Sequence, residues 1–403
     1  MPGPNSAPAR PIALRPPARL ILAALGLLGA PGAARAVEEV PKVRVVEVPG
    51  GGIQPRALAD ASGVVHLVFL RGEPGSAEVH YAAWKPGGPG FGPTVRVDDG
   101  PGSAVAIGTV RGAQLAVGRG GRVHVAWNGS GRATPANPIG GSPLLYARSD
   151  EARTAFEPRR NLMTWTTGLD GGGSVAADGS GRVYVAWHGQ VRGSEGEDRR
   201  KLWVARSTDD GATFAAEEPA WSRPTGACAC CGTGALADAR GTLHLLYRAA
   251  TDGVDRDSTL LASTDGGRTF AGASLQPWRI AACPMSTYSL VDAPSGPFGA
   301  WETKGQVYFA RLDPKGPTAS GPVSPPGGGG TRKHPAIAVN GRGEAVLAWA
   351  EGTGWQKGGA LAWQAFDRLG RPIGEPGRLD RGVPTWGLPA VVALPDGGFA
   401  IIH

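Results

Sequence analysis

The segments GRVHVAW at residues 121–127 and GRVYVAW at residues 181–187 differ at one position and lie 60 residues apart. Both consist of a glycine, an alternating apolar run and a final aromatic residue, and alternation of this kind predicts a β-strand. The other copies of this pattern are GVVHLVF (63–69), GTLHLLY (241–247), GPFGAW (296–301), GEAVLAW (343–349) and GGFAIIH (397–403). Successive copies end 48 to 60 residues apart, so the sequence contains seven similar repeat units.

Each copy belongs to a longer run of expected strands. A first strand and a tight turn precede it, as in SVAADGSGRVYVAW (174–187), where glycine accepts a positive φ at little cost. A third strand follows, such as KLWVARS (201–207) or GALAWQAF (359–366), and then a poorer fourth strand such as PTVRVD (93–98). No segment of helical periodicity and useful length interrupts the series. Each unit is therefore predicted to be a four-stranded antiparallel sheet.

Units of this kind, repeated six to eight times, are the sequence form of a β-propeller, in which radial packing buries both faces of every sheet. The last copy stops at His403 after two strands, and residues 40–51 contain a lone strand before the first full unit. We expect these two ends to share one blade and to close the ring. The sequence thus predicts an all-β propeller of seven blades. Six blades are the alternative, if the terminal hairpin only extends another blade.

Residues 1–36 are typical of a secretory signal peptide. Arginines precede an apolar run at 20–28, and ARA at 34–36 is a small-x-small cleavage pattern. The apolar run is too short to span a bilayer. We therefore predict export to the periplasm or the cell exterior, with residues 37–403 as a single propeller domain.

The charge of the chain argues against a nucleic-acid partner. Its 41 basic and 34 acidic residues give a formal net charge of +7, but four of the arginines lie in residues 1–36, which leaves +3 for the remainder. These basic residues are scattered singly and form no stripe of the kind that binds nucleic acid. No later apolar run has membrane-spanning length. We expect a soluble monomer with no nucleic-acid partner and no membrane span.

A second motif occurs twice, as STDDGATF (207–214) and STDGGRTF (263–270), and a degenerate copy lies at 147–156. Asp and Ser side chains can bond the backbone of a turn between the third and fourth strands, and Gly allows its φ angle. The aromatic residue would pack into the blade. We expect these turns to stabilise the fold and to have no part in catalysis. The positions concerned are Ser207, Asp209, Gly211, Phe214, Ser263, Asp265, Gly267 and Phe270.

With the surrounding repeat, this motif resembles the Asp-box of the sialidase-like propellers, over nearly all of residues 37–403. CACC (228–231) and CPM (283–285) are also similar to segments of secreted bacterial sialidase-like proteins. The resemblance implies that the boxes lie at the blade periphery, away from the ligand pocket.

If the protein is a sialidase, the resemblance also implies an active site that requires several specific residues. Three arginines would clamp the substrate carboxylate, a Tyr–Glu pair would be the nucleophile and an Asp the acid–base group. The family's Arg-Ile-Pro near the first blade is replaced here by QPRAL (54–58), and no motif fixes the remaining groups. The catalytic role is therefore unassigned. The candidate residues are Arg56, Arg248, Arg279, Arg332, Tyr288 and Glu302.

The four cysteines fall in two segments expected to be adjacent inner strands, with Cys228, Cys230 and Cys231 in one and Cys283 in the other. An exported protein favours disulfides, so bridges between the fourth and fifth blades are the first interpretation. The second is a thiolate metal site suited to Cu(I) or, less well, to zinc. Free buried thiols are the third. Other soft donors expected near the cysteines are Met285 and His334.

Inner strands line the channel of a propeller, so ligands are expected at its mouth. Trp355 and Lys357, in the glycine-rich segment 350–359, can stack on a sugar ring or a peptide group, and Trp386 begins the last inner segment. The sequence therefore predicts recognition of a glycan or an extracytoplasmic protein at the channel mouth. An exo-glycosidase of sialidase type is one alternative, and copper binding through the cysteines is another. No other cofactor is expected.

Overall fold

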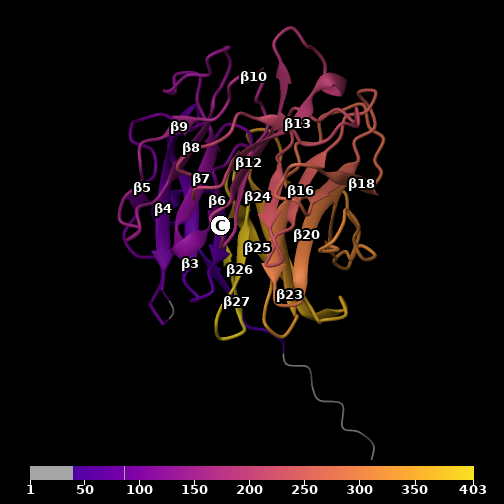
Figure 1. The fold of residues 1–403 in the computed structure, drawn as a ribbon. Coiled ribbons are helices and arrows are strands. Elements are labelled where there is room, and N and C mark those ends of the chain that lie inside the picture. Colours follow the sequence, from indigo (N-terminus) through magenta and orange to yellow (C-terminus); the bar gives the residue numbers. More distant parts are fainter. Residues whose placement is uncertain (1–39, 86) are drawn as a thin grey trace, which may run out of the picture. The chain divides into compact units, whose positions relative to one another are not determined.

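Every unit of the repeat folds into a small β-sheet (Figure 1). The computed structural model describes residues 40–85 and 87–403, and the signal peptide predicted for residues 1–36 lies outside them. Within the described residues the helical segments are three 3-10 turns, η1 (Pro49–Gly51), η2 (Arg119–Gly121) and η3 (Glu197–Arg199). No helix in this part of the chain is long and apolar enough to cross a membrane. The fold is all-β, as predicted.

Five blades have four antiparallel strands in sequence order. Blade 1 contains β2 (Ile53–Ala59), β3 (Val65–Glu73), β4 (Ser76–Trp84) and β5 (Val95–Arg96). Blade 2 contains β6 (Gln114–Val117), β7 (Val123–Asn128), β8 (Leu144–Arg148) and β9 (Arg160–Asn161). Blade 3 contains β11 (Ser174–Ala177), β12 (Val183–Val191), β13 (Lys201–Ser207) and β14 (Glu218–Pro219), with β10 (Thr166–Thr167) paired to the far end of β12. Blade 4 contains β15 (Gly234–Ala237), β16 (Leu243–Arg248), β17 (Ser258–Ser263) and β18 (Ala271–Gln276).

Blade 6 also has four strands. Blade 5 has three regular strands, and its fourth segment pairs only through isolated bridges. Blade 5 contains β19 (Ser289–Ala293), β20 (Gly296–Thr303) and β21 (Gln306–Arg311). Blade 6 contains β22 (Arg332–Val339), β23 (Ala345–Glu351), β24 (Gly359–Phe366) and β25 (Pro372–Val383). In place of a fourth strand, blade 5 has isolated bridges from Phe309 to Val323 and from Leu312 to Ala319. This segment is rich in proline, which has no N–H group for a ladder.

Blade 7 is built from both ends of the described chain. It contains β26 (Ala390–Ala393), β27 (Phe399–Ile402) and β1 (Val43–Val46). β1 pairs with β27 in parallel, with Val43 opposite Phe399. The Phe399 amide donates to the Lys42 carbonyl at 2.8 Å, and the His403 amide donates to Val46 at 3.0 Å. The predicted sharing of one blade by the two ends is confirmed.

The inner strands close into a ring. Each blade contributes its first strand, and each of these strands contacts the inner strand of the next blade. The contacts are β2 with β6, β6 with β11, β11 with β15, β15 with β19, β19 with β22, β22 with β26, and β26 with β2. The ring therefore has seven blades, and the six-blade alternative is wrong.

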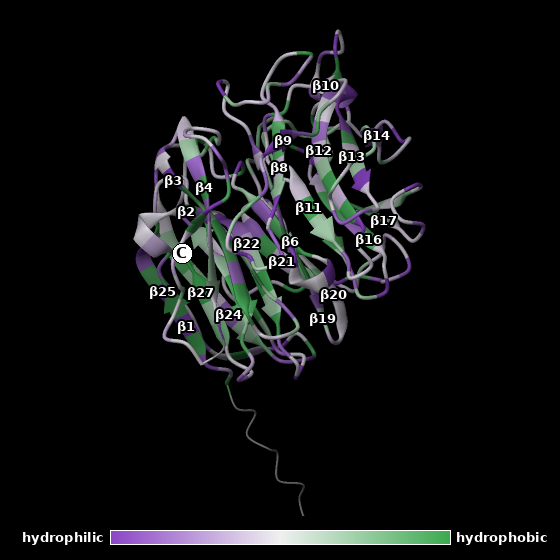
Figure 2. Cartoon of the chain, turned by 60° about the vertical axis from the view of Figure 1, so that its left-hand side comes forward, coloured by the Kyte–Doolittle hydropathy of each residue, from purple (hydrophilic) through white to green (hydrophobic). Residues whose placement is uncertain are grey.

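The core lies between neighbouring blades. The aromatic residues that end the repeat copies are among the largest fully buried side chains, including Trp127, Trp187 and Trp301. Trp187 of blade 3 packs in one cluster with Leu144 and Tyr146 of blade 2. Figure 2 shows hydrophobic residues along the strands and more hydrophilic ones in many of the connections. Because buried apolar surface contributes roughly 25 cal/mol per Å², these interfaces supply the main favourable term in folding.

The Ser-x-Asp-x-Gly turns have the geometry expected of structural turns. The Gly211 amide donates to Ser207 Oγ at 2.9 Å, and Ser207 Oγ donates to Asp209 at 2.7 Å. Asp209 also accepts bonds from the amide and the hydroxyl of Thr213, at 2.9 and 2.6 Å. Gly211 has φ 74°, in the left-handed region that favours glycine. Equivalent bonds in the second turn join Ser263, Asp265, Gly267 and Thr269.

The aromatic residues of these turns also pack against the preceding blade. The Phe214 ring lies 4.8 Å from the Tyr146 ring of blade 2, centroid to centroid, and a Cβ on Gly211 would come within 1.9 Å of the Tyr146 hydroxyl. In the degenerate copy, Phe156 packs in the same way against Tyr81 of blade 1, at 5.7 Å. The aromatic residue of the motif therefore stabilises a contact between blades.

Candidate functional site

An antiparallel meander separates its connections between two ends of the ring. Hairpins between first and second strands, and turns between third and fourth strands, lie at the Asp-box end. The other connections lie at the opposite end, which we call the mouth face. It includes the segments 107–113, 226–233, 283–287, 353–358 and 384–389.

The inner strands surround a channel of about 740 Å³. Its wall consists mainly of small or branched apolar residues, and the lining extends from the hairpin at Asp60–Ser62 to Thr109 and Val110. Arg56, Asp60, Arg153 and Asp292 are the charged residues of the lining, and one of the Arg56 guanidinium N–H groups donates to the Leu290 carbonyl at 3.2 Å. Burial lowers the pKa of Arg56 to about 10. In the described part of the chain no carboxylate pairs with Arg56.

Segment 107–113 crosses the mouth-face end of the channel. The Val110 carbonyl lies so close to Gly172 of blade 3 that a Cβ there would come within 2.1 Å of it. Gly112 packs in the same way on Gln54 of blade 1, and Gly108 lies against Trp355 of blade 6. Contacts with blades on three sides of the ring hold this segment over the channel. A large ligand at the mouth face would therefore meet segment 107–113 and the loops around it before the channel wall.

The other candidate arginines do not gather in one pocket. Arg248 is almost fully buried, 5.0 Å from the Trp278 ring, and donates to the Glu302 carbonyl at 2.5 Å. Arg279 is exposed and pairs with an aspartate at 3.0 Å. Arg332 packs over a tryptophan of β23 and pairs with a glutamate of the same strand at 3.2 Å. An arginine clamp for one substrate carboxylate is not assembled from these residues.

Tyr288 and Glu302, the candidate nucleophile pair, both lie in the interior near Arg248. Burial raises the pKa of each of them. The Glu302 carboxylate accepts bonds from the Ser286 hydroxyl and, at 2.8 Å, from the Gly305 amide. Among the described residues, no hydrogen bond joins the Tyr288 hydroxyl to Glu302. These bonds hold the buried Glu302 carboxylate in place, so its role in this geometry is to stabilise the fold.

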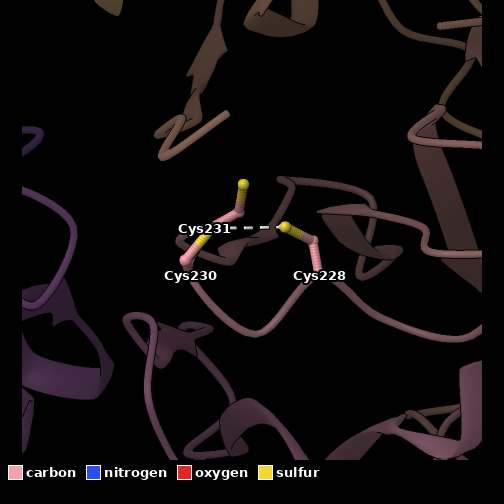
Figure 3. A group of neighbouring side chains, drawn as sticks. All are labelled: Cys228, Cys230 and Cys231. Carbon is pink, nitrogen blue, oxygen red and sulfur yellow. Dashed lines mark hydrogen bonds between the residues drawn. The ribbon is translucent and has the colours of Figure 1, made fainter. Parts of the chain in front are cut away.

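Three of the cysteines meet at the mouth face. Cys228, Cys230 and Cys231 lie in a turn before β15 and not on the inner strand itself, so the prediction of a strand position is wrong. The Cys231 amide bonds to the Cys228 carbonyl at 3.4 Å, and the Cys228 amide bonds to Arg248 in place of a strand partner. The three sulfurs lie within 4.8 Å of one another. Figure 3 shows the three cysteine side chains gathered in this turn, with a hydrogen bond between the sulfurs of Cys228 and Cys230, which lie 3.5 Å apart.

The three thiols differ in acidity. Burial opposes ionisation of Cys231, but hydrogen bonds from the two neighbouring thiols, the charge of Arg248 and the Ser286 amide outweigh it and hold its pKa well below the usual range. The pKa of Cys230 is raised by its hydrogen bonds with the two neighbouring thiols and by burial. For Cys228 the hydrogen bond with Cys230 lowers the pKa, but the hydrogen bond with Cys231 and burial outweigh it, so that pKa is raised as well. The surroundings of the turn therefore favour ionisation of Cys231 over ionisation of its two neighbours.

The other predicted soft donors, Cys283, Met285 and His334, are not part of this three-cysteine cluster. Cys283 is exposed, and all four cysteines are free thiols in the structure, so no bridge joins blades 4 and 5 there. His334 is buried, which lowers its pKa to about 3, and it shares a hydrogen bond with Thr287 at 3.3 Å. Met285 lies against Gly108, 3.8 Å from where a Cβ would be.

The predicted ligand-binding residues also lie at the mouth face. Trp355 is 58% exposed, and its ring centroid is 6.4 Å from that of Trp386 in an edge-on arrangement. Lys357 follows in the same exposed loop. Trp355 and Met285 both contact Gly108, so the aromatic pair and the segment that follows Cys283 meet over segment 107–113.

The sequence analysis missed two residues beside the cysteines. Glu197 accepts a bond from the Ala229 amide at 2.6 Å, inside the cysteine turn. Arg256 is nearly buried and donates to Glu197 at 2.6 Å. Both lie in connections between second and third strands, which place them at the mouth face. Their position in these connections could have indicated that they lie near the cysteines. Charged loop residues are usually exposed to solvent, however, so the residue types alone gave no reason to predict a role for them.

Comparison with known proteins supports the fold. No known protein family matches this chain, and no curated protein is found to be related to it. An α-L-arabinofuranosidase structure from Fusarium graminearum is similar over 81% of this chain and 97% of its own length, with TM-score 0.51 and 11% identity. A Penicillium chrysogenum α-L-arabinanase covers 80% and 95%, with TM-score 0.50 and 14% identity. A protein of unknown function from Dyadobacter fermentans covers 78% and 94%, with TM-score 0.50 and 14% identity. At these identities the similarity establishes a shared propeller fold.

Proposed function

We propose that this protein is an exported propeller that binds a glycan at its mouth face, with Trp355 as the main contact. The exposed Trp355 ring beside Trp386 is the observation that carries the proposal. A large aromatic surface left open to water on a rigid scaffold is typical of a binding site, and an indole offers a flat apolar face to the C–H groups of a sugar. Lys357 adds a cation that suits hydroxyl or carboxylate groups of the ligand. Export rests on the leader-like pattern of residues 1–36.

The arrangement favours binding over hydrolysis. Glycosidases need two carboxyl groups about 5 to 9.5 Å apart around the scissile bond. Here the candidate carboxylate Glu302 is fully buried, and the candidate arginines occupy separate places. Two solved structures that resemble this chain are named as an α-L-arabinofuranosidase and an α-L-arabinanase, which supports a carbohydrate as the ligand class.

Replacing Trp355 with alanine is expected to weaken glycan binding by 10-fold or more, roughly the loss seen when an aromatic anchor is truncated. The measurement is titration calorimetry of the reduced protein with arabino-oligosaccharides and with uronic-acid oligosaccharides. Leu369→Ala is the control, because Leu369 is 69% exposed in blade 6 but lies at the Asp-box end. An affinity that Trp355→Ala leaves unchanged, or the absence of binding to every oligosaccharide tested, would contradict the proposal.

A further inference from the structure

The cysteine turn brings three soft donors to one point. The sulfurs of Cys228, Cys230 and Cys231 lie within 4.8 Å of one another, with the closest pair at 3.5 Å. Three sulfurs bound about 2.3 Å from a central ion in a trigonal plane would be about 4 Å apart. Small side-chain rotations within the turn therefore suffice to bring all three sulfurs onto a single ion (Figure 3).

Two buried arginines lie beside this cluster, each paired with a glutamate: Arg248 with Glu302 at 3.9 Å and Arg256 with Glu197 at 2.6 Å. Arg248 is 1% exposed and Arg256 is 4% exposed, and both interact electrostatically with Cys228. Three of their buried N–H groups have no hydrogen-bond partner: Arg248 Nε, Arg256 Nε and Arg256 Nη1. A buried donor without a partner costs about 1–3 kcal/mol, so such groups call for an acceptor or a negative charge nearby. A centre with excess negative charge in the cysteine turn would supply it.

The turn itself is anchored from several directions. The Ala229 amide bonds to Glu197, and the Ser286 amide donates to Cys231 Sγ at 3.4 Å. His188 bonds to the Cys231 carbonyl at 3.2 Å. These contacts come from blades 3 and 5, so the positions of the three sulfurs are fixed by three neighbouring blades.

We propose that Cys228, Cys230 and Cys231 bind one Cu(I) ion through their three sulfurs, with N–H groups of Arg248 and Arg256 stabilising the centre. Cu(I) is soft, prefers thiolates and accepts three ligands. On binding, three Cu–S bonds form, each sulfur that still carries a proton releases it to the solvent, and no electron is transferred. The product carries two negative charges, and the unpartnered N–H groups of Arg248 and Arg256 are the donors available to it. This site is independent of the glycan site proposed above.

Zinc fits the donor set less well. Structural zinc takes four protein ligands in a tetrahedron. Cys283 is exposed and outside the three-sulfur cluster, and His334 is engaged with Thr287. The described residues therefore offer three sulfurs and no fourth donor already in place.

The test is an anaerobic titration of the reduced protein with Cu(I) in competition with a Cu(I)-specific chelator, followed by X-ray absorption at the copper edge. The expected result is one copper per chain bound by three sulfurs. Cys230→Ser should lose the tight site; Cys230 is only half-buried, so the fold should tolerate this change. Cys283→Ser is the matched control and should retain full stoichiometry. Arg256→Gln should keep the stoichiometry but weaken the affinity by about 10-fold or more.

Four results would overturn the proposal. One is the absence of a tight site in the reduced and folded protein. A second is equal loss of copper in Cys283→Ser and Cys230→Ser. A third is an absorption spectrum with fewer than three sulfurs on the metal, and a fourth is zinc binding that excess Cu(I) does not displace. Circular dichroism of every variant separates loss of the site from loss of the fold.

Discussion

A chain that begins at Val48 is expected to lose roughly 4 kcal/mol of folding stability relative to the full chain. Such a chain lacks β1, so β27 loses its parallel partner and becomes an open edge. The hydrogen bonds of a four-residue pairing, at about 1 kcal/mol each, amount to roughly 4 kcal/mol. A whole domain is stable by only about 5–15 kcal/mol. The measurement is the midpoint of urea unfolding, followed by tryptophan fluorescence.

The control for this truncation is a chain that begins at Val40, which keeps β1 intact and should unfold at the same urea concentration as the full chain. The expectation depends on ring closure by the chain ends. If the chain beginning at Val48 unfolded within experimental error of the control, β1 would contribute nothing to blade 7.

Replacing Trp187 with alanine is expected to cost about 3–5 kcal/mol of folding stability, the usual range for deleting a fully buried aromatic side chain. Trp187 has no exposed surface and packs between blades 2 and 3. Its indole N–H also donates to the Thr166 hydroxyl at 3.2 Å, so the substitution leaves that hydroxyl without one partner. The free energy of unfolding from urea titration measures the loss.

Trp165→Ala is the matched control for Trp187→Ala. Trp165 lies in the connection before blade 3 but is 46% exposed, so its removal should change stability by no more than about 0.5 kcal/mol. Equal losses in the two variants would show that the repeat aromatics do not form the contacts between blades.

The fold could be predicted from the sequence because its signals are local and repeated. Alternation in 181–187 predicts β12, and the turn motif at 207–214 forms the bonds that its residue types suggest. Ring closure could be predicted because the last unit at 397–403 is short by the strand that the N-terminal segment supplies. The missing fourth strand of blade 5 was harder to predict. The prolines of that segment have no N–H group to donate to a ladder, so the segment lies along the sheet edge without forming a regular strand.

The candidate site was predicted less completely, because its residues come together through tertiary contacts. Cys228 and Cys230 were expected on one strand face, but the backbone turns there, since the Cys228 amide bonds to Arg248 and not to a ladder partner. Arg248 follows a strand aromatic, and nothing in the local sequence indicates that it is buried. The path of segment 107–113 across the channel depends on contacts with three other blades, which no periodicity encodes.

The convergence of three thiols at the mouth face is the central claim, and reaction with arsenite tests it most directly. One arsenic(III) atom bonds three thiols with the release of three water molecules, so a triple adduct requires three sulfurs within reach of one atom. Intact mass spectrometry of the reduced protein should show one arsenic per chain, absent in Cys231→Ser and retained in Cys283→Ser. No adduct in the folded protein, or an adduct that depends on Cys283, would contradict the account.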